Sequence, residues 1–263
     1  MGKDQRVLFN STVFGPIHSR RLGTSLGINL SPEDGKVCSF DCLYCEAGFN
    51  SQGKGTTGFP SREKVKSQLK EKLEKMKENG SDLDVITFSG NGEPTLHPAF
   101  HTILEDVMKL RDEFYPDAKV SVLTNSTRIF TPEVAEALKK ADNNILKLDS
   151  AVEDTMQIID RPNSPSFTVD KVVEGLKQFS GSGIIQTMIL RGEHDGKKID
   201  NTIPEEIDAL VKAYKEIRPR EIMIYSLDRS TPEEKLVKVG KEELDAIGKK
   251  INAATGIPVV VSA

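Results

Sequence analysis

Three cysteines lie within eight residues of one another, at Cys38, Cys42 and Cys45, and they are the only cysteines in the chain. Three residues separate the first pair and two separate the second. Three thiols cannot all form disulfides, and these lie too close together for the disulfide framework of a small secreted protein. Thiolates so close in sequence can converge on one soft metal centre, and they favour zinc or an iron-sulfur cluster. The segment therefore predicts a metal or cluster site.

The absence of a fourth cysteine limits the kinds of metal site that the chain can form. Structural zinc sites and electron-transfer clusters usually take four protein ligands. A four-iron cube held by three thiolates leaves one iron free to bind a small molecule. Two alternatives remain open at this point. His18 or His97 could complete a zinc site, although neither lies at finger-like spacing from the cysteines. The three thiols could also be buried and inert, as free cysteines often are.

Composition indicates a globular chain. The 263 residues carry 36 Lys and Arg against 40 Asp and Glu, a net charge of −4, and 37% are hydrophobic. These values exclude a collagen, a coiled coil and a disordered tail. No stretch approaches the roughly 20 apolar residues of a membrane helix, and the opening MGKDQRVLFN lacks the apolar core of a signal peptide. We expect one domain over residues 1–263, located in the cytoplasm and not in a membrane.

Short β-branched runs alternate with longer segments of helical periodicity, which predicts six strands separated by helices. The strands are expected at residues 25–30, 84–88, 119–123, 144–148, 184–190 and 221–225. Strict alternation implies an α/β fold with parallel strands, arranged as a β/α barrel or as an open doubly wound sheet. The cysteines directly follow the first of these strands. They should therefore lie at the carboxyl end of the sheet, where α/β enzymes place their active sites.

Helix starts are recognisable from their capping residues. Ser61 is expected to cap a helix that Gly80 follows, Thr131-Pro132 to open a second, and Thr202 with Glu205 to form a T-x-x-E start of a third. A last helix should end near Gly256.

The pattern C-x-x-x-C-x-x-C after the first strand, with aromatic Tyr44 before the last cysteine, resembles the radical S-adenosylmethionine (radical SAM) enzymes. The resemblance implies that Cys38, Cys42 and Cys45 hold one 4Fe-4S cluster and that Tyr44 packs near the adenine of S-adenosylmethionine. In that family the open iron chelates the amino and carboxylate groups of S-adenosylmethionine. Reductive cleavage then gives methionine and a 5′-deoxyadenosyl radical, which abstracts hydrogen from a substrate.

The loop after the second expected strand is similar to the family's G-G-E-P motif, which contacts the methionine amino group. Here the residues are Ser89, then Gly90, Asn91, Gly92, Glu93 and Pro94, with Asn91 in place of the second glycine. Taken alone, it is an ordinary glycine-rich turn. Its position one β/α unit after the cysteines makes the combination specific, and the resemblance assigns residues 90–94 to cofactor binding.

Further cofactor contacts are implied at later strand ends. Thr124, Asn125 and Ser126 are similar to the family's T-N-G turn, with serine where glycine is common. Asp149 follows the fourth expected strand, where the family often binds the ribose hydroxyls or carboxylate of the cofactor. Arg191 follows the fifth and could pair with a carboxylate of cofactor or substrate, and Leu227 follows the sixth and is also assigned to cofactor binding. The ordinary role of isolated Asn, Ser and Asp at strand ends is helix capping.

Over about residues 13–230 the sequence resembles small radical SAM iron-sulfur oxidoreductases related to the tRNA wyosine synthases. The segments that carry this likeness include residues 14–27 and Asp160-Arg161-Pro162. It implies a partial (β/α)6 barrel of radical SAM type and a reducing electron donor of flavodoxin or ferredoxin type. Wyosine synthases carry a second cluster, for which this chain has no cysteines, so their activity does not transfer.

The substrate is left open by the sequence. A metabolite, a peptide and an RNA base are all compatible with it, and a local basic patch at Arg20 and Arg21 could contact RNA despite the acidic net charge. Two other function classes remain: a non-catalytic zinc- or cluster-binding module, and a plain electron carrier.

Overall fold

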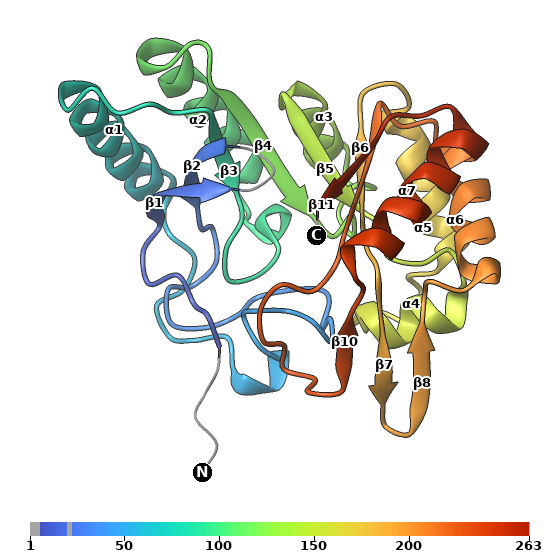
Figure 1. The fold of residues 1–263 in the computed structure, drawn as a ribbon. Helices are drawn as coiled ribbons and strands as arrows, with labels where there is room; N and C mark the ends of the chain where they lie inside the picture. Colours follow the sequence, from blue (N-terminus) through green and yellow to red (C-terminus); the bar gives the residue numbers. More distant parts are fainter. Residues whose placement is uncertain (1–5, 20–22, 263) are drawn as a thin grey trace.

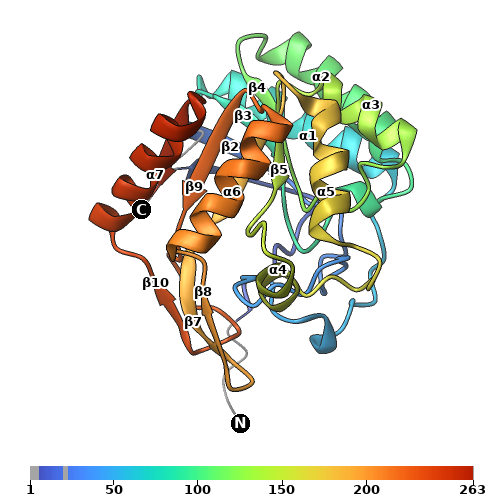
Figure 2. The same ribbon diagram turned by 90° about the vertical axis from the view of Figure 1, so that its right-hand side faces the viewer.

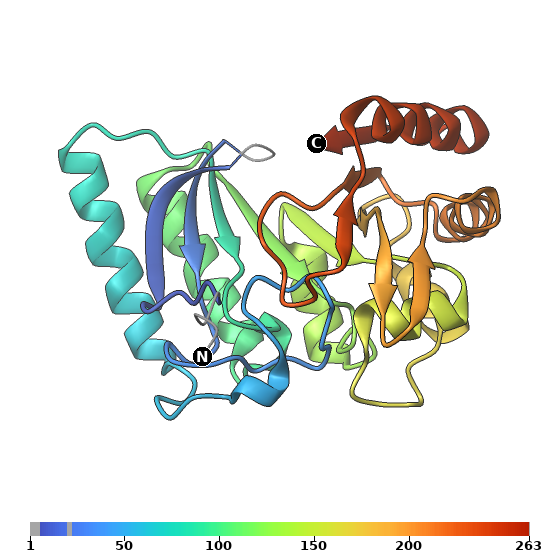
Figure 3. The same ribbon diagram turned by 60° about the horizontal axis from the view of Figure 1, so that its bottom comes forward.

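The structure is a computed structural model that describes residues 6–19 and 23–262. Its main sheet has eight strands, and it is open because its two edge strands are not paired with each other in the described residues (Figure 3). In spatial order the strands are β1 (Val13–Ser19), β2 (Gly23–Ile28), β3 (Val85–Phe88), β4 (Lys119–Thr124), β5 (Asn143–Lys147), β6 (Ile184–Met188), β9 (Glu221–Tyr225) and β11 (Val259–Ser262).

The six expected strands correspond to β2, β3, β4, β5, β6 and β9, and all six run parallel. The predicted α/β fold with a partial barrel is therefore confirmed. The sheet also extends at both edges, where β1 pairs antiparallel with β2 and β11 pairs parallel with β9.

The helices cover the outer face of the curved sheet (Figures 1 and 2). They are α1 (Arg62–Glu78), α2 (Phe100–Phe114), α3 (Pro132–Lys140), α4 (Glu153–Asp160), α5 (Val169–Leu176), α6 (Pro204–Ile217) and α7 (Lys241–Thr255), with short 3-10 turns at Asn50–Gln52, Pro94–Leu96 and Lys177–Phe179. Their apolar faces and the outer face of the sheet form the main core. In the described part of the chain, no helix is long and apolar enough to cross a membrane.

The observed helix starts agree in part with those predicted from the sequence. Ser61 caps α1 as expected, accepting a hydrogen bond from the Lys64 amide. Thr131 precedes α3 but makes no side-chain capping bond. The prediction that Thr202 caps a helix was wrong, because α6 begins at Pro204 and the residue in the N-cap position is Ile203. The Thr202 hydroxyl instead donates to Asp200 Oδ1 at 2.6 Å.

The predicted strand 184–190 was also wrong in its extent, because the chain leaves the main sheet after Met188. It continues as β7 (Leu190–His194), which joins β8 (Lys197–Asp200) and β10 (Leu236–Lys238) in a small second sheet. In Figure 1 this sheet lies at the bottom of the molecule, as does the loop after β2.

The side chain of Asn201 accounts for the break between β6 and β7. Its Oδ1 accepts a hydrogen bond from the Leu190 amide at 2.8 Å, and its Nδ2 donates to the carbonyls of Met188 and Asp149 at 2.7 and 2.9 Å. Because Asn201 is fully buried, these bonds replace sheet pairing where water is absent.

We expect Asn201→Ala to lower the free energy of unfolding by about 2 kcal/mol or more, since buried backbone groups left without partners cost about 1–3 kcal/mol. Urea denaturation followed by circular dichroism measures the change. Asn252→Ala is the control, because the exposed Asn252 amide donates only to the Ile257 carbonyl. Equal losses in the two variants would contradict this account of the break.

Candidate active site

The cysteine loop, residues 29–61, connects β2 to α1 at the carboxyl end of the sheet. Backbone pairing attaches it to the glycine loop, residues 89–94, that follows β3. The Val37 amide donates to the Asn91 carbonyl at 3.0 Å, and the Glu93 amide donates to the Val37 carbonyl at 3.0 Å. This parallel bridge between Val37 and Gly92 fixes the start of the cysteine motif against the glycine motif.

All three cysteines are free thiols; Cys42 is buried, while Cys38 and Cys45 are partly buried. Asn125 Nδ2 lies 3.6 Å from Cys38 Sγ and can donate to it. Cys42 Sγ lies 3.6 Å from Asp160 Oδ1. Burial raises the pKa of Cys38 to about 12 and the pKa of Cys42 well above its usual value. These two thiols therefore stay protonated at neutral pH, and binding of a metal centre would displace their protons.

Lys36 places a buried ammonium group inside the cysteine loop. It exposes 3% of its surface, and its Nζ donates to the Gly48 carbonyl at 2.7 Å and lies 3.5 Å from Asp41 Oδ1. Burial acts to lower the pKa of Lys36, but its electrostatic interactions with Cys45, Cys38, Cys42 and Asp41 outweigh burial, so the pKa of Lys36 is raised. A fixed positive charge thus faces all three cysteines.

The donor set fits an iron-sulfur cluster. Three thiols and one compensating cation meet in a single loop that the glycine loop holds in place. Within the residues that the structure describes, no three His, Cys, Asp or Glu side chains are placed to hold a single metal ion. In a cluster each thiolate binds a different iron, so its ligands need not converge on one point.

Glu93 joins the glycine loop to the end of β4. Its carboxylate is buried and accepts bonds from the Thr124 hydroxyl at 2.7 Å and the Asn125 amide at 2.7 Å, as well as from the amide and hydroxyl of Thr95. Burial raises the pKa of Glu93 although these bonds act to lower it. Both carboxylate oxygens face donors, so Glu93 holds two of the predicted cofactor-binding turns together.

Asn91, the departure from the family motif, has a structural role. Its side chain donates to the carbonyls of Phe9 and Pro32 at 2.9 Å and accepts from the Phe9 amide at 2.8 Å. It thereby attaches the amino-terminal segment to the glycine loop. Gly90 must be small, because a Cβ atom there would lie 2.3 Å from Asn29 Oδ1. Pro94 is the first residue of the 3-10 turn that follows.

The turn after β4 explains the family's preference for glycine at the position of Ser126. Ser126 has φ of 67°, in the left-handed region that glycine adopts most easily. Asn125 donates to Ser39 Oγ at 2.9 Å as well as to Cys38, so this turn braces the cysteine loop.

A buried charged cluster lies next to Cys42. Lys147 Nζ contacts the hydroxyl of Tyr44, lies 3.0 Å from Asp149 Oδ2 and lies 3.9 Å from Asp160 Oδ1. Tyr44 also donates to Asp149. Burial, then the charge of Asp149, raises the pKa of Asp160 well above its usual value, while the two carboxylates help to raise that of Lys147 against its desolvation. One cation therefore lies beside two carboxyl groups.

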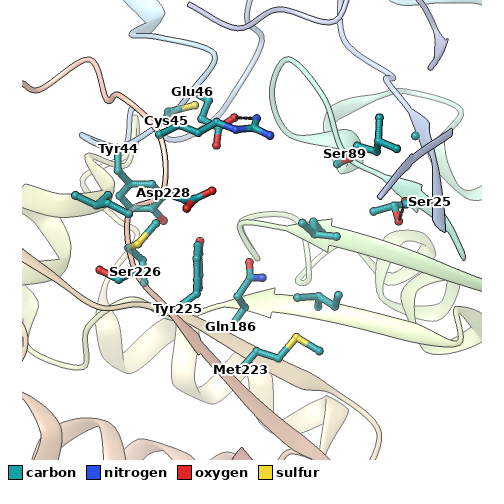
Figure 4. Close-up of a pocket in the computed structure, with 18 of the residues that line it drawn as sticks. Ser25, Tyr44, Cys45, Glu46, Ser89, Gln186, Met223, Tyr225, Ser226 and Asp228 are labelled. Carbon is teal, nitrogen blue, oxygen red and sulfur yellow. Dashed lines mark hydrogen bonds and ion pairs between the residues drawn. The ribbon is translucent and has the colours of Figure 1, made fainter. Parts of the chain in front are cut away.

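A cavity of about 420 Å³ opens inside the barrel next to the cysteine loop (Figure 4). Its rim includes Tyr44, Cys45 and Leu227, together with Arg229, whose guanidinium pairs with Glu46 at 2.6 Å. Its walls are inward-facing strand residues, namely Ser25, Gly27, Thr87, Leu123, Ile145, Gln186, Met188, Met223 and Tyr225.

The predicted site residues fall into three groups. Cys45, Tyr44 and Leu227 line the cavity. Cys38 and Cys42 lie within the cysteine loop. The glycine loop (residues 90–94), the turn at residues 124–126 and Asp149 contact the cysteine loop or its partners. Arg191 lies elsewhere. Its guanidinium pairs with Glu243 at 2.5 Å, and Arg191 does not line the cavity. Their roles in cofactor binding stay predictions. Arg20 and Arg21 lie outside the described residues.

Sequence reasoning missed Lys36, Lys147 and Gln186. Lys147 and Gln186 are paired with each other across β5 and β6. The available signal was a long polar side chain that directly follows two apolar residues in each strand. Lys36 precedes the motif by two residues, and no sequence pattern distinguishes it from a surface lysine.

The model of the radical SAM superfamily matches residues 33–199, which include the three cysteines, the glycine loop, strands β3 to β7 and most of β8. The chain belongs to the radical SAM superfamily. It is therefore an enzyme of the radical SAM type, a class that uses S-adenosylmethionine and an iron-sulfur cluster.

Curated relatives share much of the sequence. A protein named GTPase Obg of Brachyspira hyodysenteriae is 31% identical over 98% of this chain and 36% of its own length. UPF0026 proteins of Helicobacter pylori and Methanocaldococcus jannaschii are 30% and 34% identical, over 70% and 88% of this chain. The chain spans 58% and 68% of those two relatives.

Solved structures share the fold of this radical SAM chain. A radical SAM methyltransferase from Sphaerobacter thermophilus superposes with a TM-score of 0.67 at 15% identity, over 90% of this chain and 65% of its own. TYW1 with a lysine-pyruvate adduct bound gives a TM-score of 0.60 at 14% identity, over 89% of this chain and 75% of its own. These likenesses concern the fold.

We expect Gly92→Ala to impair assembly of the cysteine site. Gly92 has φ of 150°, and an added Cβ would lie 1.9 Å from the Val37 carbonyl oxygen. The bridge that positions Cys38 would have to open, so iron bound per chain after anaerobic reconstitution should fall several-fold. Gly181→Ala is the control, since its φ is also positive at 74° but no atom lies within 4 Å. Equal iron content in both variants would contradict the role of the bridge.

Proposed function

We propose that this chain binds one 4Fe-4S cluster through Cys38, Cys42 and Cys45 and cleaves S-adenosylmethionine reductively to modify a substrate by hydrogen abstraction. The observation that carries the proposal is the set of three free thiols, with no fourth cysteine in the chain, held against the glycine loop beside an internal cavity. When bound, the cluster supplies the electron that breaks the sulfonium bond and releases the 5′-deoxyadenosyl radical.

The chain's own residues would position these groups. The Val37 bridge and Glu93 hold the loops after β2, β3 and β4 in one arrangement. Asn125 can donate to the Cys38 sulfur and Lys36 places its charge beside all three sulfurs. The strands of the barrel enclose part of the cavity, and excluding water there would protect a reactive radical from side reactions.

An external electron donor completes the proposal. All three cysteines of the chain belong to the one site, so none remains to hold a second cluster. We propose a reduced protein of flavodoxin or ferredoxin type as the donor.

Anaerobically reconstituted protein, supplied with dithionite and S-adenosylmethionine, should release 5′-deoxyadenosine and methionine, measured by liquid chromatography and mass spectrometry. Cys42→Ala should abolish this release and the iron binding while keeping the helical circular dichroism, because strands and helices supply the core. Stoichiometric zinc with no iron or sulfide would instead support the non-catalytic module. An intact cluster that yields no 5′-deoxyadenosine would overturn the proposal.

Lys36 offers a test that does not depend on turnover. Reduction adds a negative charge to the cluster, and a buried cation nearby favours the reduced state. We expect Lys36→Met to lower the midpoint potential of the cluster by about 60 mV or more, the change for a tenfold shift in a one-electron equilibrium. A redox titration followed by electron paramagnetic resonance measures the midpoint potential. Lys54→Met, at an exposed lysine of the same loop, is the control and should leave the potential unchanged.

If Lys36→Met and Lys54→Met have the same potential while both carry a full cluster, Lys36 does not tune the cluster.

A further inference from the structure

The interior of the barrel holds a polar side chain that has no partner. Gln186 lies in the middle of β6 and exposes only 9% of its surface. Its amide lines the cavity and points into it (Figure 4). Among the described residues no side chain or backbone group forms a hydrogen bond with this amide. The amide is therefore free to bond to a group that enters the cavity.

Apart from Lys147, whose ammonium is bound to Tyr44 and Asp149, the strand residues that line the cavity around Gln186 are uncharged. Ser25 and Thr87 bond to each other at 2.9 Å and so are already satisfied. Met188, Met223 and Tyr225 present polarisable sulfur and aromatic surfaces, which suit a flat group. The charged lining residues, including the paired Glu46 and Arg229, belong to the loops at the rim. The part of a ligand that reaches Gln186 should therefore be uncharged.

The position of Gln186 separates it from the predicted cofactor contacts. Met188 lies two residues further along β6, towards the carboxyl end where the cysteine loop lies. Gln186 is thus deeper in the barrel than the strand end. Lys147, its partner across β5, does not compete for the amide, because its ammonium is bound to Tyr44 and Asp149.

The geometry of an amide restricts what Gln186 can hold. The side chain offers an N–H donor beside a C=O acceptor, and both are satisfied at once by a group with the complementary edge. Primary carboxamides and lactam rings carry N–H and C=O on the same side. A trans peptide bond carries them on opposite sides and can use only one of the two.

We propose that Gln186 is a specificity-determining residue that holds the substrate through an uncharged carboxamide or lactam edge. The inference rests on the proposed function, since it names the substrate class of the same cavity. Ser89, whose hydroxyl also lines the cavity and bonds to no described residue, faces it from the glycine loop (Figure 4). Ser89 is thus a second open polar group in the same cavity.

The test uses two probes that carry the edge, the lactam 2-pyridone and the primary carboxamide nicotinamide. N-methyl-2-pyridone is the matched probe, because its methyl group removes the donor and keeps the ring. Ligand-observed nuclear magnetic resonance measures their dissociation constants on the reconstituted protein saturated with S-adenosylmethionine. We expect the wild type to bind 2-pyridone or nicotinamide about tenfold more tightly than N-methyl-2-pyridone. Whichever probe binds identifies the lactam or the carboxamide as the source of the edge.

Gln186→Met keeps the length and apolar volume of the side chain and removes both polar groups. It should abolish the tenfold preference while leaving the affinity for S-adenosylmethionine unchanged. Gln68→Met, on the outer helix α1, is the control and should keep the preference. The proposal is overturned if the wild type does not prefer the probes with the edge, if Gln186→Met keeps the preference, or if Gln186→Met weakens S-adenosylmethionine binding, which would make Gln186 a cofactor contact.

A failure of the proposed function would give a different result from a failure of the Gln186 proposal. The wild type would then neither bind S-adenosylmethionine nor release 5′-deoxyadenosine. The probe measurements would be repeated without cofactor and would still decide the role of Gln186, since the cavity is formed by the chain itself.

Discussion

The site depends on one short stretch of backbone pairing. Val37 both donates to and accepts from the glycine loop, through the Asn91 carbonyl and the Glu93 amide. Two hydrogen bonds thus connect the loop that carries the cysteines to the loop that follows the neighbouring strand. Glu93 extends this connection to the end of β4. Three successive strand ends therefore form one rigid rim, and Gly92 is required there because any side chain would meet the Val37 carbonyl.

Charge is distributed unevenly around this rim. Lys36 faces the three thiols from within their own loop, and Lys147 serves two buried carboxyl groups beside Cys42. Buried ion pairs contribute little net stability, because desolvation offsets their attraction. Their effect here is local, because they place cations close to the three cysteines. The neutral cavity below the rim provides a contrasting environment in which an uncharged ligand can be held without competition from these charges.

The sequence determined the superfamily and the general architecture. The cysteine spacing together with the glycine loop indicated the radical SAM superfamily, and alternating β-branched and helical runs indicated parallel strands. Both are local properties. The spacing of the cysteines is set within one loop, and the type of each element is set by the periodicity of its apolar residues. The glycine-rich turn was recognisable for the same reason.

Tertiary structure alone decided which residues meet. Asn201 ends β6 from a distance in the sequence, so the run 184–190 looked like one strand although its last residues join another sheet. The fold also directs Arg191 to Glu243 and brings Lys36 to the three thiols. It leaves Gln186 open towards the cavity. Whether a polar side chain is satisfied depends on partners supplied by other elements, and local sequence carries no record of those partners.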